Sequence, residues 1–327
     1  MIEMIMHKSK ILILDSVHPC LKEFLEESGY YCDVETEISK KGIMQIINSY
    51  SGIVIRSRIS LDREILEKAD NLQFIARSGS GMENIDMEFA SKQNILCLNA
   101  PEGNRDAVAE HAIGMLLTLF NKIIQGDRNV RNGNWSRENN RGIELNGKTV
   151  GIIGYGNTGS SLAKKLKGFN VSILAHDKYK SGFGSNEISE CSLSDICDNA
   201  DIISLHLPYT EETERFINHE FINACSRSFF LVNTSRGRII DTEAVVEALN
   251  CQKISGACLD VLEYEGLSFE SLSGKKKSAT FKELTSMNNV ILTPHVAGWT
   301  NESYQKLSSV LAKKISLAIS EGKIKRP

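Results

Sequence analysis

The segment 150–159, VGIIGYGNTG, constrains the fold of this chain more than any other stretch. Its glycines Gly154, Gly156 and Gly159 follow an apolar run typical of a buried strand and precede a helical pattern. In such a strand–turn–helix unit the first glycine permits a tight turn and the second lets the backbone approach a pyrophosphate. The third lets helix and strand pack closely. The segment therefore predicts an α/β unit that binds a dinucleotide at the helix N-terminus.

Asp177 indicates which dinucleotide this unit binds. It ends the next apolar run, VSILAHD, about 20 residues beyond the glycines, where an acidic side chain accepts hydrogen bonds from the adenosine ribose. Its charge would repel a 2′-phosphate, so the sequence favours NAD over NADP. Lys178 and Lys180 stand beside it, and the strictness of that preference stays open.

The rest of the chain alternates short apolar runs with amphipathic segments, a rhythm that predicts parallel sheets covered by helices on both faces. The 327 residues suffice for about two such domains. Strands are expected at 11–14, 31–34, 52–55, 73–76, 95–98, 149–153, 171–174, 201–205, 229–232, 255–259 and 290–292. Helices are expected at 19–28, 106–131, 160–167 and 302–320. The polar segments 132–147 and 268–280 are expected to be loops.

Charge and composition exclude several classes of protein. Lys and Arg number 38 against 41 Asp and Glu, so the basic excess of a duplex-binding protein is missing. No stretch approaches the roughly 20 apolar residues of a membrane span, and charges interrupt the first segment, so no signal peptide is expected. The eight cysteines contain no CxxC pair, which predicts free thiols in a reducing cytoplasm and no bound metal.

Polar side chains follow three apolar strands of the second half, in the segments LVNTSRGR, GACLDVLEYEG and LTPHVAGWT. Ligands bind at the carboxyl ends of parallel strands. His295 could exchange a proton with a hydroxyl or carbonyl oxygen while hydride moves, with Glu265 as its partner. Arg236 could hold a carboxylate with two parallel bonds. Taken singly, His295 could be a core residue, Arg236 a surface ion-pair partner and Asp260 a turn cap. Their occurrence together after a dinucleotide fingerprint favours catalysis.

The chain resembles the D-isomer-specific 2-hydroxyacid dehydrogenase family over about residues 11–317, most closely its branch that oxidises 3-phospho-D-glycerate. The matching segments are RSGSGMENID, NAPEGNRDAVAEHAIGMLL, GYGNTG, LHLPYTEET, VNTSRGRIID, GACLDVLEYE and TPHVAG. The resemblance implies two doubly wound parallel-sheet domains with a cleft between them. A flavodoxin-like substrate domain would take 1–105 plus 298–327, and a Rossmann NAD-binding domain 106–297. It also implies a homodimer, formed through the helix 106–131 and the Trp135 loop.

The resemblance also implies roles for individual residues. Arg236 would hold the substrate carboxylate and carbonyl, and Glu265 and His295 would form the acid/base dyad. Where the family usually has proline after this glutamate, the chain has Gly266. Cofactor-contacting positions are matched by Gly154, Gly156, Asn157, Thr158, Gly159, Asp177, His206, Leu207, Pro208, Thr234, Ser235, Arg236, Asp260, His295, Ala297, Gly298 and Ser80. Substrate-binding positions are matched by Arg56, Arg77, Ser78, Gly79, Ser80, Gly81, Arg236 and His295.

The arginines of the first domain bear on the substrate. Arg56, Arg58 and Arg77 follow apolar strands, and several guanidiniums around a small site suit a doubly charged acid. The sequence therefore predicts oxidation of 3-phospho-D-glycerate to 3-phosphohydroxypyruvate, a step of serine biosynthesis. Two alternatives stay open. The same chemistry could act on glyoxylate, hydroxypyruvate or lactate, or the chain could be an NAD(H)-sensing binding protein of the corepressor type.

Overall fold

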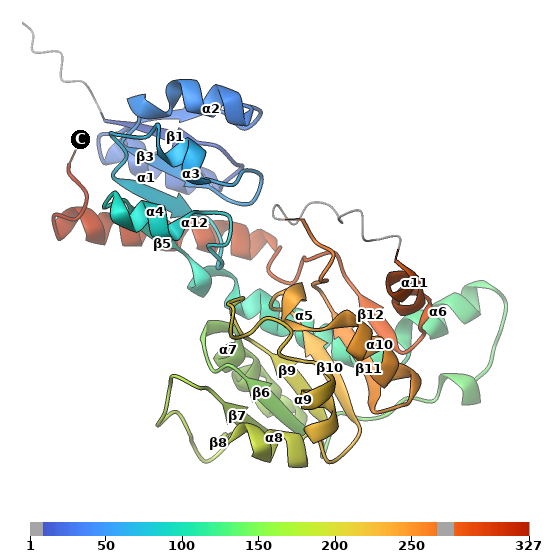
Figure 1. Ribbon diagram of the computed structural model, residues 1–327. Coiled ribbons are helices and arrows are strands. Elements are labelled where there is room, and N and C mark those ends of the chain that lie inside the picture. The colour runs from blue at the N-terminus through green and yellow to red at the C-terminus, as the bar shows by residue number, and fades with distance from the viewer. Residues whose placement is uncertain (1–8, 267–277, 327) are drawn as a thin grey trace, which may run out of the picture. The chain divides into compact units, whose positions relative to one another are not determined.

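The computed structural model describes residues 9–266 and 278–326, which form two compact units (Figure 1). The first unit contains residues 9–104, 266 and 299–326. The second contains residues 105–265 and 278–298. Each has its own sheet and its own core, and each is described by itself.

The sheet of the first unit has five parallel strands in the order β2-β1-β3-β4-β5. The strands are β1 (Lys10–Ile13), β2 (Tyr31–Val34), β3 (Gly52–Ile55), β4 (Phe74–Arg77) and β5 (Leu96–Asn99). The helices are α1 (Pro19–Glu27), α2 (Lys40–Ile46), η1 (Ile47–Ser49), α3 (Arg63–Leu66), α4 (Met87–Lys92) and α12 (Asn301–Ser320).

Alternation along the strands divides the core of this unit into two layers. Ile11, Ile13 and Phe74 face α1 and α12, whereas Leu12 and Ile53 face α2, α3 and α4. Successive side chains of a strand point to opposite faces, so a strand that is apolar throughout requires helices on both sides. Because β3 and β4 are parallel, their carboxyl ends lie at the same edge of the sheet, between the two helical layers.

The sheet of the second unit has seven parallel strands in the order β12-β11-β10-β9-β6-β7-β8. The strands are β6 (Thr149–Ile153), β7 (Ser172–His176), β8 (Ser189–Glu190), β9 (Ile202–Leu205), β10 (Phe229–Asn233), β11 (Ile254–Leu259) and β12 (Val290–Leu292). Its helices are α5 (Pro101–Phe120, which begins in the first unit), α6 (Ile123–Arg131), η2 (Glu138–Asn140), α7 (Asn157–Leu166), η3 (Lys167–Phe169), α8 (Leu193–Asn199), α9 (His219–Ala224), η4 (Gly237–Ile239), α10 (Thr242–Asn250) and α11 (Ala279–Ser286).

Helices cover both faces of this second sheet as well. α5 and α7 pack on one face, and α8, α9, α10 and α11 pack on the other. The strand order reverses at β6, which lies between β7 and β9 (Figure 1). Such a reversal opens a crevice at the carboxyl ends of the strands, where ligands of open α/β sheets bind. The predicted fold class, two doubly wound parallel sheets, is confirmed.

The single helix expected at 106–131 is wrong. The helix α5 starts earlier, at Pro101, and ends at Phe120. Lys122 then adopts a left-handed φ of 50° before α6 begins. The left-handed backbone of Lys122 ends the helical ladder, and the carbonyl of Phe120 accepts the amide of Ile143 at 3.0 Å. Among the described residues no single helix is long and apolar enough to cross a membrane. Only α5 and α6 together have that length and composition, and they are bent by 56°.

One strand was missed and one loop boundary was placed too late in the predictions from sequence. The strand β8 was not expected, because its two residues are exposed and carry no apolar signal. Of the loop predicted at 268–280, residues 268–277 lie outside the described residues. Ala279 and Thr280 already belong to α11, whose N-cap Ser278 accepts the amide of Phe281.

Candidate active site

The three glycines that follow β6 have different surroundings. Gly154 has a φ of 95°, and a Cβ there would lie 2.4 Å from the carbonyl oxygen of His206. A Cβ on Gly159 would lie 2.0 Å from the carbonyl oxygen of Gly154. At Gly156, by contrast, a Cβ would meet nothing within 4 Å. Two of the glycines are therefore required by the turn and its packing, whereas the third borders open space.

The N-terminus of α7 can hold a phosphate in that space. The backbone amides of Gly156, Asn157 and Thr158 donate no hydrogen bond to any residue that the structure describes. The N-cap Gly156 supplies no side chain to satisfy them. Amides at a helix N-terminus point along a dipole that attracts negative charge, so this end of α7 is suited to a pyrophosphate.

Asp177 follows β7 directly and links two loops of the dinucleotide site. Its Oδ2 accepts the amide of Tyr155 at 2.8 Å, and its Oδ1 accepts the amides of Tyr179 and Lys180 at 2.9 and 3.0 Å. Lys178 forms an ion pair with Glu212, which offsets its charge. The carboxylate of Asp177 therefore lies beside the glycine-rich turn, where the Lys180 ammonium also donates to the carbonyl of Tyr155 at 3.4 Å.

His206 connects the end of β9 to the first turn of α7. Its Nε2 lies 2.9 Å from the Ser204 hydroxyl and its Nδ1 lies 3.1 Å from the Thr158 hydroxyl. The imidazole is buried, and burial lowers the pKa of His206 to about 4. The ring is therefore neutral at pH 7 and holds Thr158 in place as a hydrogen-bonding residue.

Acidification should destabilise the protein through His206. The unfolded chain takes up a proton near pH 6.5 but the folded chain only near pH 4. Stability that is present above pH 6.5 is therefore lost as the pH falls toward 4. This residue alone should lower the free energy of unfolding by about 2 kcal/mol between pH 7 and pH 5. Urea titrations of wild type and His206→Gln at both pH values measure it. An equal pH dependence in the two proteins would contradict the prediction.

His295 and Glu265 lie in hydrogen-bond contact. The Nδ1 of His295 is 2.7 Å from Oε2 of Glu265, and both side chains are mostly buried, with 23% and 13% exposed. The second carboxylate oxygen of Glu265 accepts the amide of Leu262. Because the carboxylate accepts the Nδ1 proton, Nε2 is the ring nitrogen that can take or give a proton at a ligand.

Arg236 follows β10 in a loop that buried polar groups hold. The side chain of Asn233 donates to the carbonyl of Arg236 at 2.9 Å and accepts the amide of Ser235 at 3.0 Å. The Ser235 hydroxyl donates to the carbonyl of Leu205 at 2.5 Å. A Cβ on Gly237 would lie 2.0 Å from the Leu262 carbonyl, so the loops after β10 and β11 are packed together.

Other predicted cofactor residues lie at the carboxyl ends of neighbouring strands. Leu207 and Pro208 follow β9, Thr234 follows β10, and Ala297 and Gly298 follow β12. The Thr234 hydroxyl is buried and has no hydrogen-bond partner within the described chain. Buried polar groups rarely lack a partner, so this hydroxyl fits a site whose ligand supplies one.

The predicted residues of the first unit lie at the ends of β3 and β4. Arg77 is 7% exposed, and its Nε donates to the carbonyl of Arg56 at 3.1 Å. The guanidinium of Arg56 stacks on Trp299 at 3.6 Å, and burial lowers its pKa. Both guanidiniums are therefore held in place by contacts of their own unit.

The turn 78–81 offers two backbone donors. The amide of Ser78 donates to the carbonyl of Ile55, and the amide of Gly79 donates to the carbonyl of Arg77. The amides of Ser80 and Gly81 donate to no residue within the described parts of the chain. The Ser80 hydroxyl donates to the side-chain oxygen of Asn104 at 2.7 Å. Of the four substrate-binding positions predicted in this turn, Ser80 and Gly81 therefore have backbone amides suited to a carboxylate.

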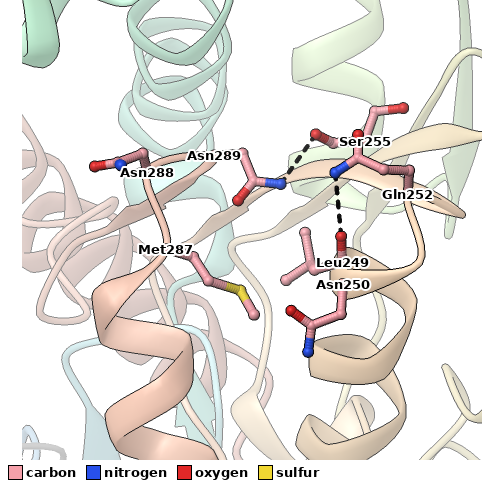
Figure 2. Close-up of a pocket in the computed structure, with 7 residues that line it drawn as sticks. All are labelled: Leu249, Asn250, Gln252, Ser255, Met287, Asn288 and Asn289. Atoms are coloured by element: carbon pink, nitrogen blue, oxygen red, sulfur yellow. Dashed lines mark hydrogen bonds between the residues drawn. The ribbon is translucent and has the colours of Figure 1, made fainter.

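A hollow of about 310 Å³ lies elsewhere, at the opposite edge of the second sheet. Figure 2 shows its lining at the amino ends of β11 and β12 and the ends of α10 and α11. It is formed by Leu249, Asn250, Gln252, Ser255, Met287, Asn288 and Asn289. The side chain of Asn289 donates to the carbonyl of Ser255 at 3.3 Å. None of the predicted site residues lines this hollow.

Comparisons with known proteins identify the family of this chain. Residues 113–297 match the family described as "D-isomer specific 2-hydroxyacid dehydrogenase, NAD binding domain". D-3-phosphoglycerate dehydrogenase of Archaeoglobus fulgidus is 33% identical over 94% of this chain and 56% of its own length. Glyoxylate reductase of Pyrococcus furiosus is 32% identical over 89% of this chain and 85% of its own length.

One solved structure is similar to this chain over nearly its whole length. It is that of D-lactate dehydrogenase from Aquifex aeolicus, complexed with NAD and lactic acid. It has a TM-score of 0.82 and 28% identity, and 97% of each chain is covered. The present chain spans a little over half the length of the D-3-phosphoglycerate dehydrogenases that it matches.

Proposed function

The chain belongs to the D-isomer specific 2-hydroxyacid dehydrogenase family, and from this membership we propose that it oxidises or reduces the C2 oxygen of a small acid. NAD is the cofactor of its second unit. The observation that carries the proposal is the contact of 2.7 Å between His295 and Glu265 beyond a dinucleotide-binding turn. We further propose that the physiological substrate is 3-phospho-D-glycerate, converted to 3-phosphohydroxypyruvate in serine biosynthesis.

We propose a separate role for each group of residues at the strand ends. The amides at the start of α7 and the carboxylate of Asp177 would hold the pyrophosphate and the ribose. Bound NAD supplies an acceptor for the hydride that leaves C2. During oxidation Nε2 of His295 takes the hydroxyl proton, and Glu265 stabilises the imidazolium that forms. In reduction the protonated His295 returns that proton to the carbonyl oxygen.

Arg236 and the first unit would bind the acid. The guanidinium of Arg236 would pair with the substrate carboxylate and polarise the C2 oxygen. The amides of Ser80 and Gly81 would donate to the same carboxylate. Arg56 and Arg77, at the ends of adjacent strands, would attract a phosphate.

A second candidate substrate class has its own support. The Nε of Arg77 already donates to a carbonyl, and Arg56 already stacks on Trp299. Arginines engaged in this way would also fit a family member that acts on glyoxylate, hydroxypyruvate or lactate. The relatives named glyoxylate reductase and D-lactate dehydrogenase are similar to this chain over most of its length.

The assembly that we propose is a cytoplasmic homodimer. The helix α6 and the segment after it expose Ile123, Ile124 and Val130, and Trp135 is 82% exposed. Exposed large apolar side chains suit a protein interface, and Trp is enriched at such interfaces. All eight cysteines are free thiols, which supports a reducing compartment.

An absorbance assay at 340 nm tests the proposed function. NADH and NADPH are each combined with 3-phosphohydroxypyruvate, hydroxypyruvate, glyoxylate and pyruvate. We expect NADH to be preferred, and kcat/KM to be highest for the phosphorylated acid. In Arg56→Gln that advantage should shrink, whereas hydroxypyruvate kinetics should stay unchanged.

Each other outcome has a defined meaning. Turnover of unphosphorylated acids alone would contradict the proposed phosphate site at Arg56 and Arg77. The proposed acid/base and hydride-transfer mechanism would still stand. A protein that binds NADH but turns over none of the four acids would contradict the enzymatic proposal. A sensor or corepressor would then be the better description.

A further inference from the structure

His111 lies on α5 and contacts the loop that carries His295. Its Nε2 is 3.0 Å from the hydroxyl oxygen of Thr293 and 3.5 Å from Oδ1 of Asp260. A role for this residue was not predicted from the sequence, in which His111 is one of several polar residues of an amphipathic helical segment. The side chain is 26% exposed, so it is partly withdrawn from solvent.

The direction of the hydrogen bonds follows from the available protons. Thr293 donates its hydroxyl proton to Oδ1 of Asp260 at 2.6 Å. The threonine oxygen can then only accept from His111, so Nε2 of His111 carries a proton. His111 therefore acts as a donor at the junction between Thr293 and Asp260.

Asp260 binds the loop on both sides of His295. Its Oδ1 also accepts the amide of Val296 at 2.9 Å, and its Oδ2 accepts the amide of Ala297 at 2.9 Å. Its backbone carbonyl accepts the amide of His295 at 2.7 Å. Asp260 is 1% exposed, and such a buried carboxylate is stable only when hydrogen bonds compensate for its lost hydration. Burial alone would raise the pKa of Asp260, but the bonds from His111, Thr293 and the loop amides lower it overall.

The loop that carries His295 depends on these hydrogen bonds because its backbone is strained at His295. His295 has a φ of 55°, in the left-handed region that residues other than glycine seldom adopt. A strained conformation of this kind persists only where the surrounding contacts over-determine it. The orientation that brings Nδ1 of His295 to Glu265 therefore depends on the bonds that converge on Asp260.

We infer that His111 is a positioning residue. It fixes Thr293 and Asp260, and these two residues hold His295 in its active orientation. The inference rests on the acid/base role proposed for His295. Without the Nε2 donor, the buried carboxylate loses a partner and Thr293 can rotate. The loop then samples conformations in which His295 is no longer held against Glu265.

Kinetics of three variants test the inference. In His111→Ala we expect kcat to fall roughly tenfold to a hundredfold, with KM and the NADH dissociation constant within about twofold of wild type. His111→Gln should recover most of the loss, because its amide group can donate to Thr293. The matched control is Glu110→Gln, which removes an exposed ion pair with Lys165 from the neighbouring position and should leave kcat unchanged. If His111→Ala does not fold, His111→Asn, which is polar but shorter, replaces it.

A measurement on the substrate-free protein separates this inference from the proposed function. In protein labelled with [15N]histidine, the Nδ1 proton of His295 should give a low-field resonance, because it is donated to Glu265; His295→Asn assigns it. In His111→Ala this proton should exchange with water at least severalfold faster.

An unchanged kcat together with an unchanged resonance in a folded variant would overturn the inference. So would a lower melting temperature with neither effect, which would mark a purely structural role. If the wild type turned over none of the acids, the proposed function would fail, and the exchange rate would still decide the role of His111.

Discussion

Replacing His295 with asparagine should lower kcat roughly a thousandfold or more, because the reaction loses its only proposed proton carrier. Asparagine is the informative substitute. It tolerates the left-handed backbone that His295 adopts at a φ of 55°, whereas alanine does so less readily. The loss in His295→Asn can therefore be assigned to the missing imidazole rather than to a rearranged loop.

NADH binding provides the control for this prediction. The dinucleotide-binding turn is built on β6 and α7, so the NADH dissociation constant, measured by quenching of protein fluorescence, should stay within about threefold. Glu265→Gln should give a smaller loss of kcat, since Nε2 of His295 remains and only its charged partner is removed. Turnover of His295→Asn close to wild type would end the assignment of His295 as acid and base.

Replacing Arg236 with alanine should lower kcat/KM roughly a thousandfold, since the substrate carboxylate would lose its proposed charged partner in a half-buried site. Arg236→Lys should recover only part of this, because an ammonium group lacks the planar fork of a guanidinium. The effect should fall on KM and on kcat together, as expected of a group that both binds and polarises.

Arg238 offers the matched control two residues along the same loop. Its guanidinium pairs with Glu214 at 3.4 Å and lies over the ring of Tyr209 at 5.0 Å. Arg238→Ala should leave kcat/KM within about twofold, because exposed ion pairs contribute little. Equal losses in the two alanine variants would show that the loop, rather than the guanidinium of Arg236, limits the reaction.

Local signals in the sequence predict most of the secondary structure and miss what depends on contacts. The strand at 149–153 was predicted with its observed bounds, since an apolar run ends at a glycine turn. The break after Phe120 was missed, because the apolar residues Ile123 and Ile124 follow it and nothing in the sequence marks the left-handed backbone of Lys122. The two residues of β8 gave no signal, since an exposed edge strand needs no apolar face.

The candidate site was predicted unevenly for similar reasons. The roles of the glycines and the placing of Asp177 follow from one contiguous segment of strand, turn and helix. Glu265 was predicted as the partner of His295 because both follow apolar strands of the second half, and the carboxyl ends of parallel strands meet at one edge of the sheet. His111 was missed altogether. Its partner Thr293 is remote in sequence, and a histidine within an amphipathic helix is indistinguishable in sequence from an ordinary packed residue.

The three glycines after β6 are required for two different reasons. Gly154 and Gly159 are surrounded by backbone atoms, so any larger side chain there would be rejected by the fold itself. Gly156 has an ordinary φ of −86° and free space beside it, so the chain alone would tolerate other residues there. The open space beside Gly156 is where a pyrophosphate would approach the backbone of a dinucleotide-binding turn. A lineage that abandoned the nucleotide could therefore vary at this position first and still inherit an intact scaffold.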